Sequence, residues 1–344
     1  MARFLFVHAH PDDETLATGI AMAWALREGH DVDLVTCTLG DEGEVIPPEL
    51  AHLVASESDT LWAYRRGELS RAMAALAPAG SSGGRLRHTV LGDEHWSMPG
   101  DPATKAPARY RDSGMAGTPS ATHPRAFMGA DVGEAAALLA AQIDDSDPDV
   151  VVTYDVGGGY GHPDHIQTRR AVTAALGRLG RTGPDELFEI VTPQSWVDED
   201  RRWLRAHVPA VDGMVVPTPG DPYAVSVVPD GWVSHSVDAP ELVAVQAAAL
   251  AAHRTQVTVR GGSYTLSNQV AARLSGREGY ARVEPIRGRR WASLGRRPGE
   301  LTRQSLTGTF RGTGPRSLSV KVGRSVGPTM GPIHDREANV DAEQ

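Results

Sequence analysis

Two short stretches rich in histidine and carboxylate each follow an apolar run, and they constrain the fold more than any other feature. Residues 4–7 (FLFV) precede the stretch 8–14 (HAHPDDE), and residues 150–154 (VVVTY) precede the stretch 157–165 (GGGYGHPDH). Apolar residues at helical spacing follow each stretch. Both stretches therefore lie where a buried strand passes into a helix, and a proline suits the first turn of such a helix.

Predicted strands and helices alternate along the first half of the chain. Strands are expected at residues 4–7, 31–37, 87–91 and 150–154, and helices at 15–27, 59–76, 132–143 and 166–179. This order predicts an α/β fold with a Rossmann-like, doubly wound, mainly parallel sheet. In the strand order 3-2-1-4, the first and fourth strands are neighbours and ligands bind beyond their carboxyl ends. His10 and His165 should then lie within reach of one metal ion.

The regular alternation ends near residue 184. Short strands are expected at 187–191, 225–228 and 232–233, and a helix at 240–253. We therefore expect a metal-binding domain over residues 1–184 and a smaller C-terminal α+β portion over 185–297 that closes over the active site. Residues 298–344 are rich in Gly, Ser, Pro, Thr and Arg with scattered apolar residues, which predicts a disordered tail.

Composition excludes several classes of partner. The net charge of −9 argues against a nucleic-acid-binding surface. No apolar run approaches the roughly 20 residues of a membrane-spanning helix, so no membrane partner is expected. The start of the chain has no signal-peptide pattern, and Cys37 is the only cysteine. We expect a cytoplasmic protein, and the oligomeric state is left open.

The two motifs offer a metal site. His10, Asp13 and His165 would provide the three protein ligands typical of a zinc hydrolase, with a position left for water or substrate. The expected cofactor is one Zn²⁺ per subunit, although Fe²⁺ also suits two histidines and a carboxylate. The alternative is a pair of helix-capping carboxylates with solvated histidines. The presence of two such motifs at adjacent strand ends favours the interpretation as a metal site.

Four further residues are candidates for catalysis. Asp12 adjoins a predicted ligand and could act as general base for a metal-bound water, or serve only as a helix N-cap. His162 could stabilise the oxyanion together with the metal. Asp164 could orient or tune His162, or be solvated at the surface. Tyr160, on a glycine-rich loop, could donate its phenol to the same oxyanion, or only pack.

Two other kinds of binding site fit the sequence less well. A dinucleotide site fits badly, because the first turn is acidic and would repel a pyrophosphate. Gly157, Gly159 and Gly161 also lack the dinucleotide-binding spacing. A non-catalytic sugar- or nucleotide-binding module is the second alternative. Asp12 argues against it, since binding alone needs no unligated carboxylate beside a metal.

Residues 10–14 (HPDDE) together with residues 162–165 (HPDH) resemble the PIG-L/LmbE superfamily of zinc-dependent deacetylases. Further segments are similar to the inositol-glycoside deacetylases of mycothiol biosynthesis within that superfamily: residues 36–46, 64–69, 111–118, 152–155, 253–257 and 266–268. The resemblance covers roughly residues 3–285. An apparent insertion from Asp93 to Arg109 and the tail beyond about residue 298 depart from the pattern.

This resemblance implies that His10, Asp13 and His165 bind the metal and that Asp12 is the general base. In the same way it implies that His162 and Tyr160 stabilise the oxyanion. It also implies that Arg65, Asp112 and Glu44 bind substrate hydroxyls. The expected reaction is removal of acetate from the 2-acetamido group of a small-molecule substrate, N-acetylglucosaminyl-inositol. The alternatives are a mycothiol S-conjugate amidase and a deacetylase of another N-acetylglucosaminyl glycoside, and the insertion could alter that preference.

Overall fold

The computed structural model describes residues 1–77, 83–99, 101, 106–180, 184, 186–209 and 213–283. The tail expected at 298–344 lies outside the described residues, as do residues 102–105 of the apparent insertion. The helices are α1 (Asp13–Arg27), α2 (Leu61–Leu76), α3 (Val132–Ser146), α4 (Gly158–Gly161), α5 (Pro163–Leu179), α6 (Gln194–His207) and α7 (Val243–Ala252). None of the helices in this part of the chain has the length and apolar character needed to cross a membrane.

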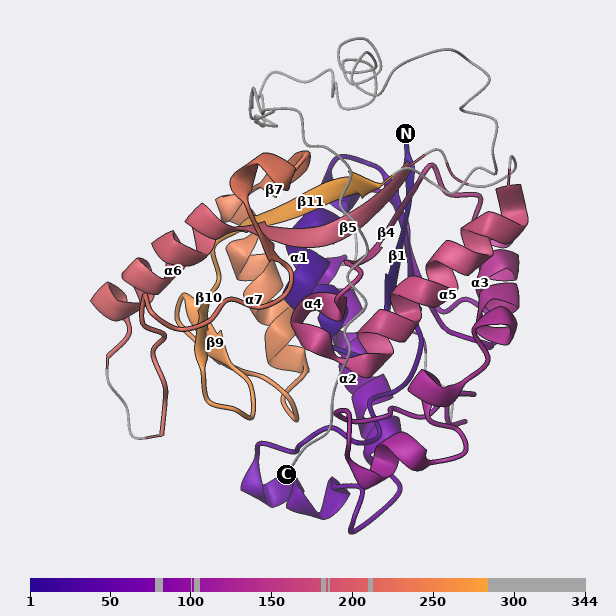
Figure 1. Ribbon diagram of the computed structural model, residues 1–344, viewed down its shortest axis with the longest axis horizontal. Coiled ribbons are helices and arrows are strands. Elements are labelled where there is room, and N and C mark those ends of the chain that lie inside the picture. The colour runs from indigo at the N-terminus through magenta and orange to yellow at the C-terminus, as the bar shows by residue number, and fades with distance from the viewer. Residues whose placement is uncertain are drawn as a thin grey trace, which may run out of the picture.

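The strands form a mixed α/β architecture. They are β1 (Arg3–His8), β2 (Asp31–Thr36), β3 (Leu86–Val90), β4 (Val150–Tyr154), β5 (Glu186–Pro193), β6 (Val227–Val228), β7 (His235–Asp238), β8 (Thr258–Arg260), β9 (Ser263–Thr265), β10 (Ala271–Arg273) and β11 (Arg277–Val283). The larger sheet among the described residues has the order β3-β2-β1-β4-β5-β11-β7, with β6 paired to β5 (Figure 1). The first five of these strands are parallel, and β11 is antiparallel to both of its neighbours.

The predicted adjacency of the first and fourth strands is confirmed. β1 and β4 pair in parallel with Phe4 opposite Val150, so both motifs begin at the same edge of the sheet. Alternate residues of β1 enter different cores, as the two-residue period of a strand requires. Phe4 and Phe6 pack with α1 and α2, whereas Leu5 packs with α3 and α5 on the opposite face. Helices therefore cover both faces, and the carboxyl edge stays available for a site.

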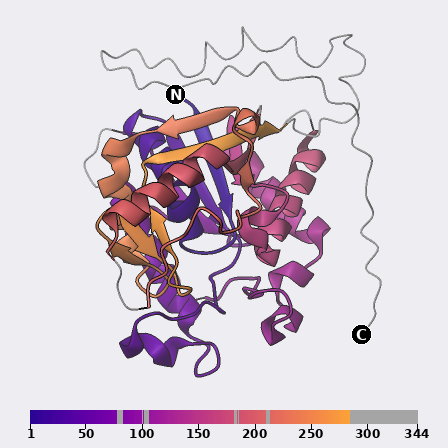
Figure 2. The ribbon, with the colours of Figure 1, turned by 60° about the vertical axis from the view of Figure 1, so that its left-hand side comes forward.

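The C-terminal elements are built onto the same sheet. β11 and β7 extend it beyond β5, while β8, β9 and β10 form a small separate sheet. In both views the orange C-terminal elements lie beside α1 and α6 and away from α3 and α5 (Figures 1 and 2). The division of the chain at residue 184 stays a prediction.

Two local expectations were wrong. Residues 232–233 were expected as a strand, but a 3-10 turn covers Asp230–Trp232. Helix α6 was not expected, because few aliphatic residues mark its inner face. Instead, Trp196 and Trp203 of α6 stack under the guanidinium groups of Arg277 and Arg273. Such cation–π contacts stabilise a helix that an aliphatic pattern does not reveal.

Glu278 on β11 reaches the backbone of α1. Its carboxylate accepts the N–H groups of Ile20 and Ala21 at 2.8 and 2.9 Å and the hydroxyl of Tyr280 at 2.7 Å. Burial raises the pKa of Glu278 to about 7, although these three hydrogen bonds lower it. Between the ordinary glutamate pKa and 7, the folded protein thus holds a proton that the unfolded chain has released.

This predicts that the contribution of Glu278 to stability falls as pH rises from about 4.5 to 7, because the folded state binds more protons. A Glu278→Gln variant has no such proton. Its unfolding free energy relative to wild type should rise across this range by up to about 3 kcal/mol. Urea unfolding of both proteins at several pH values measures the change, and a pH-independent difference would contradict the prediction.

Candidate metal centre

The two motifs meet at the carboxyl ends of β1 and β4. Asp13, within the first motif, begins α1, and His162, within the second, is the N-cap of α5. His10 and His165, predicted to be neighbours, have ring centroids 5.3 Å apart. Both helices thus begin at the cluster, where their N-terminal dipoles favour the carboxylates.

Three donor atoms form a nearly equilateral triangle. His10 Nδ1 lies 3.2 Å from Asp13 Oδ2, and His165 Nε2 lies 3.3 Å from each of them. In a tetrahedral zinc site with bonds of about 2.0–2.1 Å, neighbouring ligand atoms are roughly 3.3–3.4 Å apart. The three predicted ligands therefore fit a tetrahedral divalent ion without rearrangement. All three residues are buried.

Hydrogen bonds orient the members of the triangle. His165 Nδ1 lies 3.1 Å from the carbonyl of Gly158, and this leaves Nε2 free to bind a cation. Asp13 Oδ2 accepts the hydroxyl of Tyr154 at 2.7 Å and the N–H of His10 at 2.9 Å. Tyr154 was not singled out from the sequence; its position at the end of the strand before the second motif was the available signal.

Asp164 contacts a different histidine from the one predicted. Its carboxylate lies 3.3 Å from His10 Nε2 and accepts the N–H and hydroxyl of Ser113 at 2.8 and 2.5 Å. Only its backbone N–H reaches His162, at Nδ1. The expected orientation of His162 by the Asp164 carboxylate was therefore wrong. Asp164 instead orients His10, with Asp112 Oδ1 3.5 Å from the same ring nitrogen.

The electrostatics of the cluster suit a cation. Burial favours the neutral form of Asp13, but His165 and His10 outweigh it and hold its pKa well below the usual range. Burial lowers the pKa of His10, yet the Asp112 carboxylate and its neighbours raise it well above the ordinary value. The effect of the carboxylates on the pKa of His10 is thus larger than the effect of burial. A divalent ion would take the place of the proton that this environment attracts.

Asp12 lies outside the triangle. It occupies the N-cap position of α1, but its side chain makes no capping hydrogen bond. The carboxylate accepts from Arg65 Nη2 at 3.2 Å. Burial raises the pKa of Asp12 to about 7; the charge of Asp13 also raises this pKa, and that of Arg65 lowers it. A carboxylate whose pKa is close to neutral suits a general base.

His162 and Tyr160 also border the cluster. The ring centroid of His162 is 4.6 Å from that of His10, and the Tyr160 centroid is 5.2 Å from that of His165. Since His162 Nδ1 accepts a backbone N–H, its Nε2 carries the proton in the neutral ring. Burial and the neighbouring imidazoles lower the pKa of His162 to about 3, so the ring is a neutral donor at pH 7.

The predicted substrate-binding residues differ in exposure. Arg65 is buried, and its guanidinium donates to the carbonyls of Gly40 and Pro11 as well as to Asp12. A Cβ at Gly40 would lie 1.8 Å from Arg65 Nη1, so this approach needs a glycine. Asp112 is also buried, whereas Glu44 is exposed. The role of these side chains in binding hydroxyls stays a prediction.

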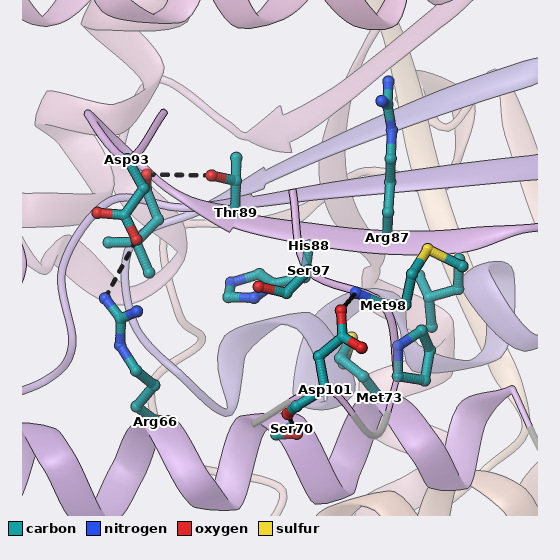
Figure 3. A pocket seen from close by; sticks show the side chains of 13 residues that line it. Arg66, Ser70, Met73, Arg87, His88, Thr89, Asp93, Ser97, Met98 and Asp101 are labelled. Atoms are coloured by element: carbon teal, nitrogen blue, oxygen red, sulfur yellow. Dashed lines mark hydrogen bonds and ion pairs between the residues drawn. The ribbon is translucent and has the colours of Figure 1, made fainter. Parts of the chain in front are cut away.

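A separate small pocket lies over β3 and the apparent insertion. Residues of α2, β3 and the segment 93–101 line it, including Arg66, His88, Asp93 and Ser97 (Figure 3). With a volume of about 30 Å³, it has room for one or two water molecules and not for a sugar. It contains none of the predicted site residues, so the candidate site remains the cluster at β1 and β4.

Comparisons with known proteins agree with this location. The family model described as "PIG-L: GlcNAc-PI de-N-acetylase" matches residues 5–176, which include both motifs. The chain is 43% identical to a 1D-myo-inositol 2-acetamido-2-deoxy-alpha-D-glucopyranoside deacetylase 2 of Catenulispora acidiphila, covering 80% of this chain and 86% of that protein. A deacetylase of the same substrate name from Rhodococcus opacus is 44% identical, covering 78% and 87%. Among solved structures, a triple mutant of a deacetylase of teicoplanin biosynthesis is 19% identical, covers 82% of this chain and 99% of that chain, and has a TM-score of 0.45.

Proposed function

The chain belongs to the PIG-L family of GlcNAc-PI de-N-acetylases, and from this premise we propose that it removes acetate from N-acetylglucosaminyl-inositol. The observation that carries the proposal is the triangle of His10, Asp13 and His165 with the unligated carboxylate of Asp12 beside it. The substrate is inferred from relatives whose names specify this glycoside. We interpret the five parallel strands as the Rossmann-like part of the fold.

The three donors would hold a divalent ion, with zinc the first choice and ferrous iron the alternative. Such an ion supplies a Lewis acid and lowers the pKa of water. Asp12 accepts the proton of the water that attacks the acetamide carbon, and its pKa of about 7 suits this transfer.

His162 Nε2–H donates a hydrogen bond to the carbonyl oxygen as negative charge develops on it. Tyr160, with 57% of its surface exposed, adds a second donor. Asp12 then gives the proton that it took from water to the amide nitrogen, the C–N bond breaks, and the amine leaves. The products are acetate and the free amino sugar.

Acetate release tests the proposal. The purified protein with added zinc should release acetate from N-acetylglucosaminyl-inositol and leave the amide of a mycothiol S-conjugate intact. Activity should disappear after chelation and return with zinc. Cleavage of the conjugate without acetate release from the glycoside would overturn the proposed substrate.

We further propose that the protein acts in the cytoplasm, because a single cysteine allows no disulfide within the chain. Neither a nucleic acid nor a membrane enters the proposed reaction.

A further inference from the structure

A buried chain of hydrogen bonds connects the C-terminal part of the protein to Asp12. His253 Nε2 lies 2.8 Å from Glu14 Oε1, and Glu14 Oε2 accepts the backbone N–H of Asp12 at 2.8 Å. The side chains of Glu14 and His253 are both completely buried. The chain thus runs from the end of α7 to the backbone of the candidate general base.

The backbone of Asp12 needs such support. Its φ angle of 110° is rare for a residue with a side chain. Strain of this kind costs on the order of 1–3 kcal/mol and persists only where the surroundings fix it. Glu14 holds the N–H of Asp12, and Arg65 holds its carboxylate. The direction of the carboxylate therefore depends on contacts on both sides of the residue.

Glu14 in turn needs a partner. Its carboxylate is buried next to two other carboxylates, those of Asp12 and Asp13, and a buried charge is costly unless it is paired. The hydroxyl of Thr15 donates to Glu14 at 2.6 Å, and the ring of His253 provides the ionisable partner. Without His253, Glu14 would lose the contact that fixes one of its two oxygens.

The segment that carries His253 is itself anchored. The N–H and hydroxyl of Thr255 donate to Glu68 of α2 at 2.9 and 2.6 Å. Gln256 Nε2 donates to the carbonyl of Glu44 at 3.0 Å. These contacts fix residues 253–256 to α2 and to the loop that carries Glu44. The segment resembles the family in sequence, but none of its residues was predicted to bind metal or substrate.

We propose that His253 is a positioning residue: through Glu14 it holds the backbone of Asp12, and so directs the Asp12 carboxylate toward the attacking water. This inference rests on the proposed deacetylase function. It gives the C-terminal part of the chain a share in catalysis.

Three variants test the proposal. His253→Ala should lower kcat by about 10- to 100-fold, as loss of an orienting contact does, with KM and zinc content unchanged. His253→Gln should restore most of kcat, since its amide nitrogen can take the place of Nε2. Gln246→Ala is the matched control, because Gln246 is also buried, lies on α7 and donates to the carbonyl of Thr15 on α1. It should keep the wild-type kcat.

A second measurement is independent of activity. Hydrogen exchange of the Asp12 amide should be faster in His253→Ala and near wild type in the other two variants. Unchanged exchange in His253→Ala, or an equal loss of kcat in Gln246→Ala, would overturn the proposal. If His253→Ala does not fold, His253→Asn replaces it, since the shorter amide cannot reach Glu14. If the wild-type protein released no acetate, the proposed function would be refuted. The exchange rate of the Asp12 amide would still show whether His253 holds the backbone of Asp12.

Discussion

Replacing His165 by alanine should remove bound metal and acetate release together while the protein stays folded. The substitution leaves two of the three donors, and a histidine at the start of α5 contributes to the site more than to the hydrophobic core. Metal analysis after dialysis, acetate release and circular dichroism measure the three properties. Full activity in metal-free protein would refute the metal-dependent mechanism.

The matched control is His162→Ala. His162 also lies close to His10 and His165, and these three could form an alternative ligand group. Its Nδ1 accepts a backbone N–H, however, and we assign its other nitrogen to the oxyanion. His162→Ala should therefore keep the metal and lose kcat. Equal metal loss in both variants would mean that His162 is a ligand.

Asp12→Asn should retain the metal and lower kcat by roughly 10²- to 10⁴-fold, the usual range for a general base. The amide keeps the size of the side chain and can still accept from Arg65, but it cannot take a proton from water. The measurement is acetate release under saturating substrate, together with zinc content. A kcat close to wild type would contradict the role of Asp12.

The neighbouring residue provides the comparison. Asp13 Oδ2 belongs to the donor triangle, so Asp13→Asn should weaken metal binding, and excess zinc should restore part of the activity. Excess zinc should not restore the activity of the Asp12→Asn variant. If both variants lost metal to the same extent, the division of roles between these adjacent carboxylates would be wrong.

The region of the site could be predicted from the sequence because the residues that mark it lie in two short segments. Each motif is a few residues long and follows an apolar strand, and parallel strands end at one edge of a sheet. That is enough to expect His10 near His165. Direct partners of side chains were harder to predict: Asp164 was expected to orient His162, and the structure places its carboxylate against His10.

Residues that act from a distance were missed. Tyr154, Glu14 and His253 were not assigned roles, since a hydrogen bond between residues far apart has no signature in composition or spacing. Arg65 was expected only to bind substrate, and the contacts of its guanidinium with two carbonyls and Asp12 were not predicted. Helix α6 was missed because aromatic–arginine stacking replaces the aliphatic stripe on which periodicity depends.

The sequence by itself determined the α/β class and the adjacency of the two motifs, and it supplied the candidate donor residues, because these follow from strand–helix periodicity and the types of side chain at strand ends. The tertiary structure decided which atoms face one another. It set the 3.2–3.3 Å spacing of the donors, the strained backbone of Asp12 and its support by the histidine that follows α7. Such distances depend on how helices pack on the sheet, and packing is a property of the whole folded chain.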